Sequence, residues 1–257
     1  MSDHWDFYFC RINDHEASIF LDLGLAREAP LPGLRYAATI QLQMRRPRED
    51  GLSSQDEYPT LIEIENHLKA VLENSGTLYI GRCTYNGLRE FHFRLEDAID
   101  WPRRAAQALT TFQDYLHQTL SRDDPEWSVY FDFLHPSPED NERISNRQVC
   151  DRMADQGDPL IEPRDIDHWI YFDAATSRDA FITQVAALGF AVRELLERDE
   201  HRDQCGVRLY RSDIPSADRI NDITLPLFRA ALEHAGDYDG WECEVRRPAG
   251  SADESNG

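Results

Sequence analysis

Residues 166–172 read Ile-Asp-His-Trp-Ile-Tyr-Phe, a run whose side chains alternate between two faces. Trp169 and Tyr171 fall on one face, and His168 falls on the other with two apolar neighbours, which is the period of a β-strand. Residues 177–188 then place apolar side chains at helical spacing, and a glycine follows. This stretch predicts a strand that leads directly into a helix.

The rest of the second half extends this pattern. Residues 190–195 and 207–210 predict two strands on either side of a charged loop, residues 216–234 predict a second helix, and residues 238–245 predict a last strand. The order strand, helix, strand, strand, helix, strand is the ferredoxin-like one. Such a unit packs its helices on one face of an antiparallel sheet.

The first half repeats this order after an N-terminal hairpin. Strands are predicted at residues 36–44, 78–80, 91–93 and 115–120, and helices at residues 59–73 and 101–113. We therefore predict an α+β protein made of two ferredoxin-like α/β sandwiches. A proline-rich segment near Pro136 indicates the boundary. The predicted domains are residues 1–136 and 137–248, and the Gly-, Ser- and acid-rich residues 249–257 form a disordered tail.

The charge balance restricts the classes of partner. The formal net charge is −21, from 48 acidic and 27 basic residues. Such a chain repels phosphate backbones, so we expect no direct contact with nucleic acid, whereas a basic protein partner is attracted. The regular rows of acids that a nucleic-acid mimic needs are not found. No apolar run reaches the roughly 20 residues of a membrane span, and the acidic start lacks the pattern of a secretory signal. We expect a cytoplasmic protein that does not bind membranes.

Motifs for catalysis, metals or cofactors are weak. The five cysteines are widely spaced without a Cys-x-x-Cys pair, and no two histidines flank a glutamate at helical spacing. There is no Gly-x-Ser-x-Gly elbow and no Gly-rich phosphate loop. We therefore expect no catalytic residue, no cofactor and no metal. The alternative is an uncharacterised hydrolase or transferase with a site at the domain interface; its first candidates are His168, Asp167 and Arg82, although Asp167 and His168 point to opposite faces of one strand.

The last predicted strand carries the most specific motif. Residues 235–241 read Ala-Gly-Asp-Tyr-Asp-Gly-Trp. In a regular strand Tyr238 and Trp241 lie on opposite faces, but a bulge at Gly240 would rotate one of them. These aromatic side chains either cap the core or contribute to a partner-binding surface. The candidate partner-binding residues are Trp169, Tyr238, Asp239, Gly240 and Trp241.

Both halves resemble known families. Residues 138–248 resemble the RraB family, small acidic inhibitors of ribonuclease E, most sharply in Tyr238-Asp239-Gly240-Trp241. This resemblance implies a ferredoxin-like domain that binds the non-catalytic scaffold region of the ribonuclease and modulates RNA decay. The chain differs from that family because it lacks a long acidic tail and has an additional N-terminal domain.

Residues 3–135 resemble a bacterial family of unknown function, DUF695. The similarity lies in Trp5-Asp6-Phe7-Tyr8, Tyr79-Ile80-Gly81-Arg82 and Asp124-Pro125-Glu126-Trp127, and it implies no activity. Taken together, the sequence predicts a non-catalytic, regulatory protein-binding module. The expected partner is a basic segment of ribonuclease E or of another RNA-processing enzyme.

Overall fold

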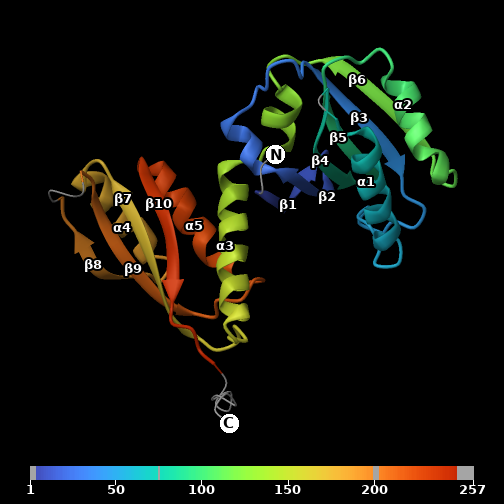
Figure 1. Cartoon of the computed structure of the whole chain (residues 1–257). Coiled ribbons are helices and arrows are strands. Elements are labelled where there is room, and N and C mark those ends of the chain that lie inside the picture. Colours follow the sequence, from blue (N-terminus) through green and yellow to red (C-terminus); the bar gives the residue numbers. More distant parts are fainter. Residues whose placement is uncertain (1–3, 75, 199–202, 248–257) are drawn as a thin grey trace, which may run out of the picture. The chain divides into compact units, whose positions relative to one another are not determined.

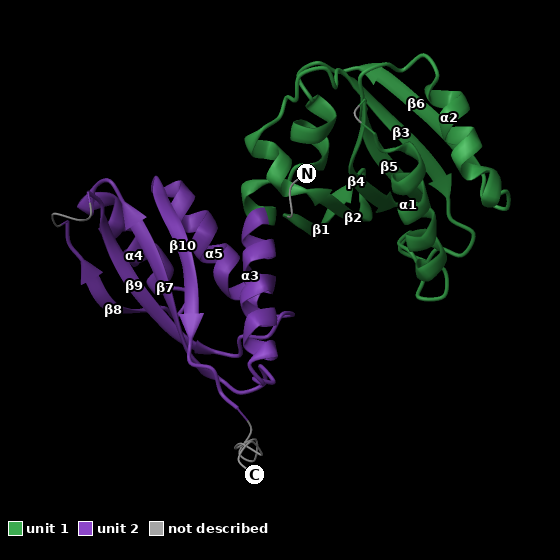
Figure 2. Ribbon diagram, in the orientation of Figure 1, with its two compact units in different colours: residues 1–140 green, residues 141–257 purple. Residues whose placement is uncertain are grey.

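The computed structural model describes residues 4–74, 76–198 and 203–247, and the predicted disordered tail, residues 249–257, lies outside them. The chain divides between residues 140 and 141 into two compact units, named unit 1 and unit 2 (Figure 2). Each unit contains an antiparallel sheet with helices packed against it (Figure 1). This architecture confirms the predicted α+β class.

Unit 1 is built on a six-stranded sheet in the order β1-β2-β4-β5-β3-β6. An N-terminal hairpin extends one edge, and the remaining four strands alternate with two helices in the order β-α-β-β-α-β. The bounds of these elements are β1 (Trp5–Ile12), β2 (His15–Asp22), β3 (Tyr36–Gln43), α1 (Tyr58–Leu72), β4 (Thr77–Tyr85), β5 (Leu88–Leu95), α2 (Trp101–Ala108) and β6 (His117–Asp123).

The two faces of this sheet are covered differently. On one face, Leu61, Ile64 and Leu68 repeat at helical spacing along α1 and are fully buried in a core shared with α2. Tyr8 lies on the opposite face, where its hydroxyl donates a hydrogen bond of 2.9 Å to the carbonyl of Leu134. Leu134 ends a π-helical turn, η3 (Val129–Leu134), which the sequence patterns did not predict. A short 3₁₀ helix, η1 (Leu23–Arg27), follows the hairpin.

Unit 2 is built on a four-stranded sheet in the order β10-β7-β9-β8. Helix α3 (Pro138–Asp155) precedes the sheet and contributes Cys150 and Met153 to the core. The other elements are β7 (Arg164–Phe172), α4 (Ala175–Ala186), β8 (Ala191–Leu196), β9 (Cys205–Asp213), α5 (Ile220–Glu233) and β10 (Gly236–Cys243). Numbered within the unit, the strands of this β-α-β-β-α-β segment lie in the order 4-1-3-2, and the corresponding four strands of unit 1 lie in the same order.

Two predicted helix starts in unit 2 are wrong. Helix α4 begins at Ala175, so Ser177 lies inside its first turn and no side chain caps the helix. Helix α5 begins at Ile220, because residues 216–219 form a turn in which the Arg219 amide bonds to the Ser216 carbonyl. In both places, a serine that could cap a helix does not lie at the N-cap position: Ser177 is inside the first turn of α4, and Ser216 is in the turn before α5.

We propose that the two units are independently folding domains, divided at residues 136–140. Residues 137–257 expressed alone are expected to unfold in one cooperative transition, because unit 2 has its own buried core. Differential scanning calorimetry should place this transition within about 4 °C of one of two transitions in the full chain. A segment without a cooperative transition would contradict the division.

Candidate functional site

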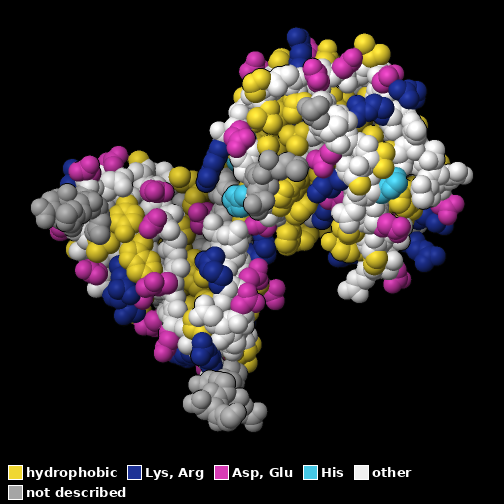
Figure 3. Space-filling view, viewed as in Figure 1, with side chains coloured by type: hydrophobic (Ala, Val, Ile, Leu, Met, Phe, Trp, Pro, Cys, Tyr) yellow, Lys and Arg dark blue, Asp and Glu magenta, His cyan; other side chains and the backbone are white. Residues whose placement is uncertain are grey.

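The sheet of unit 2 has one face against the helices and one open face. Along β7, Ile166, Ile170 and Phe172 are fully buried in the core with α4 and α5. The alternate residues of the same strand, which include Asp167 and Trp169, therefore point to the open face. In the view of Figure 1 the sheet lies in front of α4 and α5, and the space-filling view shows hydrophobic side chains over it with charged side chains around them (Figure 3).

Ion pairs join three strands across the open face. The Asp167 carboxylate accepts hydrogen bonds of 2.6 Å from Arg193 Nε on β8 and 2.9 Å from Arg208 Nη2 on β9. Arg193 also donates to Asp165, at 2.9 Å. These side chains line a shallow depression of about 790 Å³ together with Glu242. Because each carboxylate of the centre is already paired with an arginine, the centre of this face carries little net charge.

Trp169 is a partly exposed aromatic residue beside these ion pairs. The guanidinium carbon of Arg208 lies 4.9 Å from the centroid of its ring, within the range of a cation–π contact. On its other side, Trp169 pairs with Gly240 of β10, and a Cβ atom at Gly240 would have no neighbour within 4 Å. One flank of the indole is held by an arginine, and the other borders open space.

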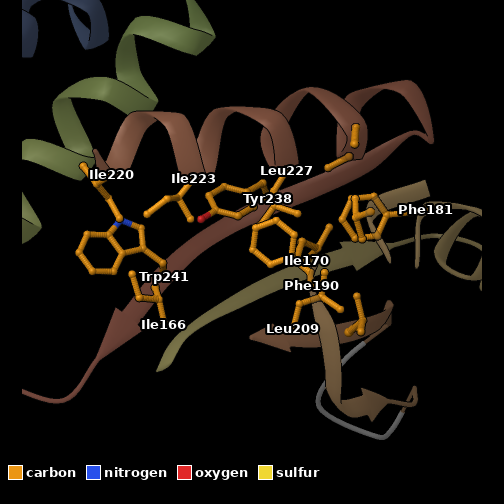
Figure 4. Close-up of a cluster of buried hydrophobic side chains, with 14 of the residues drawn as sticks. Ile166, Ile170, Phe181, Phe190, Leu209, Ile220, Ile223, Leu227, Tyr238 and Trp241 are labelled. Atoms are coloured by element: carbon orange, nitrogen blue, oxygen red, sulfur yellow. The ribbon is translucent and has the colours of Figure 1, made fainter. Parts of the chain in front are cut away.

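The Tyr-Asp-Gly-Trp motif contains the bulge that the sequence analysis considered. The register of β10 against β7 shifts between Tyr238 and Gly240, and Gly240 has a φ of +122°, which favours glycine. The bulge turns both Tyr238 and Trp241 toward the helices (Figure 4). Their exposed fractions are 5% and 8%. Both aromatic residues of the motif are therefore part of the core.

Hydrogen bonds fix each of these aromatic side chains. The Tyr238 hydroxyl lies 2.9 Å from Nδ1 of His168, and Trp241 Nε1 donates a bond of 2.7 Å to the Asn146 side chain on α3. Asn146 in turn donates to Thr224 on α5, at 2.7 Å. The motif thus ties the edge strand to β7 and to the two helices that cover it.

The five candidate partner-binding residues consequently divide into two groups. Trp169, Asp239 and Gly240 have accessible surface, whereas the side chains of Tyr238 and Trp241 are buried. The assignment of all five to a partner surface stays a prediction. Arg193 and Arg208 were not among the predicted site residues. Their only sequence signal is that each is a polar residue on the solvent-facing side of a strand.

An acidic cluster lies at the β10 edge of unit 2. Burial, and then the negative charges of Asp237 and Asp239, raise the pKa of Glu142 on α3 to about 7. A cation placed beside these three carboxyl groups would favour the charged form of Glu142. The cluster therefore suits a positively charged segment of a partner.

The alternative hypothesis of an enzyme named His168, Asp167 and Arg82 as its first candidates. Strand β7 carries Asp167 and His168 but places their side chains on opposite faces. His168 is fully buried, and burial followed by the charge of Arg211 lowers its pKa to about 3, so the imidazole is neutral at pH 7. Asp167 points to the other face, as predicted. Arg82 belongs to unit 1, where it forms a two-point ion pair with Glu65. In the part of the chain that the structure describes, no three His, Cys, Asp or Glu side chains form a metal-binding group.

Comparisons with known proteins bear on both units. Residues 143–243 match the family Regulator of ribonuclease activity B (RraB), and residues 3–135 match a family of unknown function (DUF695). Among curated proteins none matches the chain. A solved structure described as an unknown protein from Galdieria sulphuraria covers 81% of this chain and 97% of its own, at 11% identity and a TM-score of 0.22, which is too low to bear on the fold.

Within the described ranges, no helix combines the length and apolar character needed to cross a bilayer.

The two family matches have the positions that the sequence resemblances predicted. The chain belongs to the DUF695 family, and its C-terminal part matches the RraB family.

Proposed function

We propose that unit 2 is a non-catalytic regulatory module that binds a protein partner in the cytoplasm. The partner is ribonuclease E or another RNA-processing enzyme, and the module modulates its activity. The observation that carries this proposal is the match of residues 143–243 to a family described as a regulator of ribonuclease activity. The open sheet face and the adjacent acidic cluster of Glu142, Asp237 and Asp239 are the proposed contact surface.

The composition of this surface supports a binding role. Tryptophan and arginine are enriched among the residues that dominate binding energy at interfaces, and Trp169 and Arg208 stack on each other at its centre. The acidic cluster at the β10 edge and the net charge of −21 favour a basic segment as the contacting part of the partner.

The ion-paired side chains at the centre of the sheet face do not have the features of an acid–base site. A general base needs a pKa near the working pH and a free lone pair. Asp167 accepts hydrogen bonds from two arginines, and the neutral His168 is buried on the other side of the strand. The polar groups of the face are therefore positioned by one another rather than available to a substrate.

Trp169→Ala is expected to weaken partner binding about 30-fold, because loss of a central interface tryptophan costs about 2 kcal/mol. The stability of unit 2 should fall by less than in a variant of a fully buried tryptophan, since the side chain of Trp169 is partly exposed. The measurement is affinity capture from lysate of the source organism with the full chain as bait. Ribonuclease E or another identified RNA-decay protein should be recovered by the wild type and lost with Trp169→Ala.

The matched control is Leu232→Ala, which removes a side chain that is 57% exposed on α5, away from the open face. It should recover the same proteins as the wild type. Because exposed charges are screened over about 8 to 10 Å at ordinary ionic strength, binding should also weaken as salt is raised. Equal recovery by wild type and Trp169→Ala, or loss with both variants, would contradict this contact surface.

A further inference from the structure

Among the residues that the structure describes, four arginines are buried almost completely, and one of them differs from the others. Arg94 pairs with Asp124, Arg164 with Asp158, and Arg178 with Glu197. Arg89, which is 2% exposed, forms no ion pair with a carboxylate among the described residues. A buried charge without a counter-charge is costly, and proteins retain few of them. The burial of Arg89 without an ion pair is unexpected in a chain with 48 acidic and 27 basic residues.

The hydrogen bonds of Arg89 go to neutral hydroxyl groups, and Glu65, the carboxylate that acts on its charge, forms its ion pair with Arg82. Its Nε donates a bond of 3.0 Å to the Thr84 hydroxyl, and Nη2 donates one of 3.3 Å to the Ser53 hydroxyl. Its Nη1 is buried and has no hydrogen-bond partner in the described part of the chain. Burial, and then the neighbouring Arg82, lower the pKa of Arg89 to about 10. The guanidinium group thus remains protonated at neutral pH.

Arg89 lines a cavity of about 250 Å³ in unit 1. Two further arginines, Arg48 and Arg82, line it with hydroxyl-bearing side chains of Ser18 and Ser53. Arg82 is neutralised by Glu65 and Arg48 by Asp50, at 2.6 and 2.5 Å. Of these three arginines, Arg89 is the one that forms no ion pair with a carboxylate of the described residues.

The first residue of α1 also borders this cavity. Tyr58 lines it and begins a helix of 15 residues, and a helix N-terminus favours a negative charge nearby. Phe9, which is 57% exposed, adds an apolar wall. The cavity therefore combines a cationic centre, hydroxyl donors and apolar surface.

We propose that this cavity binds a small organic anion, whose phosphate or carboxylate group is held by Arg89. A guanidinium group matches the geometry of both oxyanions. In Arg89 the Nη1 nitrogen has no partner among the described residues, whereas Nε and Nη2 donate to Thr84 and Ser53. Serine and threonine hydroxyls supply further donors. The volume is below the range of about 300 to 1,000 Å³ typical of drug-sized ligands, so the ligand is smaller than a nucleotide. Unit 1 would then sense or carry a small acidic molecule, independently of the partner of unit 2.

The first test measures anion binding by the full chain. Thermal unfolding is followed with inorganic phosphate, phenyl phosphate or benzoate, each against sodium chloride at equal ionic strength. At least one of these probes should raise the unfolding temperature of unit 1 in a saturable manner. Binding of the two phosphates alone identifies a phosphate site, and binding of benzoate alone identifies a carboxylate site. If no probe acts beyond the chloride control, the proposal is wrong.

The second test distinguishes a ligand-binding arginine from a structural one. Arg89→Met removes the charge at similar length and is expected to weaken anion binding at least tenfold. Without anion, this variant should unfold at the same temperature as the wild type or higher, because a buried unpaired charge is removed. Arg89→Lys keeps the charge but not the planar fork, and it should bind with intermediate affinity. Arg103→Met, at an exposed position on α2, is the control and should bind like the wild type.

A structural role for Arg89 predicts the opposite results. Arg89→Met would then lower the unfolding temperature without anion, and Arg89→Lys would bind the probe as tightly as the wild type. Either that pair of results or an unchanged anion affinity in Arg89→Met would overturn the proposal.

Discussion

Trp241→Ala is expected to lower the free energy of unfolding of unit 2 by about 4 kcal/mol, as is typical of a buried tryptophan. The indole packs in the core with Ile166, Ile220 and Ile223 (Figure 4), so its removal leaves a large cavity. The substitution also leaves the buried Oδ1 of Asn146 without its donor. The cost therefore has two sources, lost packing and an unsatisfied polar group.

The measurement is urea-induced unfolding of residues 137–257, followed by circular dichroism. Trp241→Phe separates the two sources, because it keeps an aromatic ring but removes the N–H donor. It should cost about 1 to 3 kcal/mol, less than the alanine variant. A change below about 1 kcal/mol for Trp241→Ala would mean that the indole is not part of a packed core.

Because Trp241 is part of the core, it is a poor choice for a mutation that tests partner binding. A Trp241 variant that loses its partner would report damage to the fold as readily as a lost contact. Trp169, which pairs with Gly240 across the bulge, is the better probe of the surface. The motif shapes the sheet edge, and its accessible members are Asp239 and Gly240.

Asp158→Ala is expected to destabilise unit 2 by about 3 to 5 kcal/mol, the usual cost of removing one partner of a buried ion pair. Asp158 and Arg164 are 2% and 3% exposed, and they form a two-point ion pair. Asp158 also accepts bonds from the backbone amides of Leu160, at 2.8 Å, and Arg246, at 2.7 Å. One carboxylate thus joins the segment before β7 to the segment after β10.

The control for this prediction is the double variant Asp158→Ala/Arg164→Met. Removing both charges should cost less than removing the aspartate alone, because no unpaired cation remains in the core. Urea unfolding of the wild type, both single variants and the double variant gives the coupling energy. Additive effects in the double variant would contradict the ion pair.

Asp158 also predicts a dependence of stability on pH. Burial by itself would raise its pKa, but the hydrogen bonds from Arg164, Arg246 and Leu160 outweigh burial and lower the pKa to about 2. An aspartate in the unfolded chain has a pKa of about 3.9. The folded state therefore binds the proton less tightly, and this contribution is complete above about pH 5 and lost progressively as the pH falls through 4 toward 2. Asp158→Ala should lack this component of acid destabilisation.

The order of strands and helices was predictable because side-chain periodicity is a local property. Residues 166–172 alternate between the core and the open face as the sequence indicates. The start of α5 was not predictable in the same way, because the turn at residues 216–219 and the helix use similar polar residues. The π-helical turn η3 has no periodic signal of its own, and its position depends on contacts with distant residues such as Tyr8.

The contacts among the site residues could not be predicted from the local sequence either. Asp167, Arg193 and Arg208 meet only because of the register of three strands, including a bulge between Val192 and Glu194. Arg89 did have a sequence signal: it lies two residues before Phe91 on the same face of its strand, where an apolar residue is expected. A charged residue in a core-facing position is the pattern that could have identified the cavity.

The central claim, that unit 2 binds and regulates an RNA-processing enzyme, is tested most directly by calorimetric titration of the full chain into purified ribonuclease E from the same organism. The account predicts saturable binding that weakens with salt, falls about 30-fold in Trp169→Ala and is unchanged in Leu232→Ala. Absence of saturable binding to ribonuclease E and to any RNA-processing enzyme recovered by affinity capture would contradict it. Equal affinity of the wild type and Trp169→Ala would contradict the proposed surface.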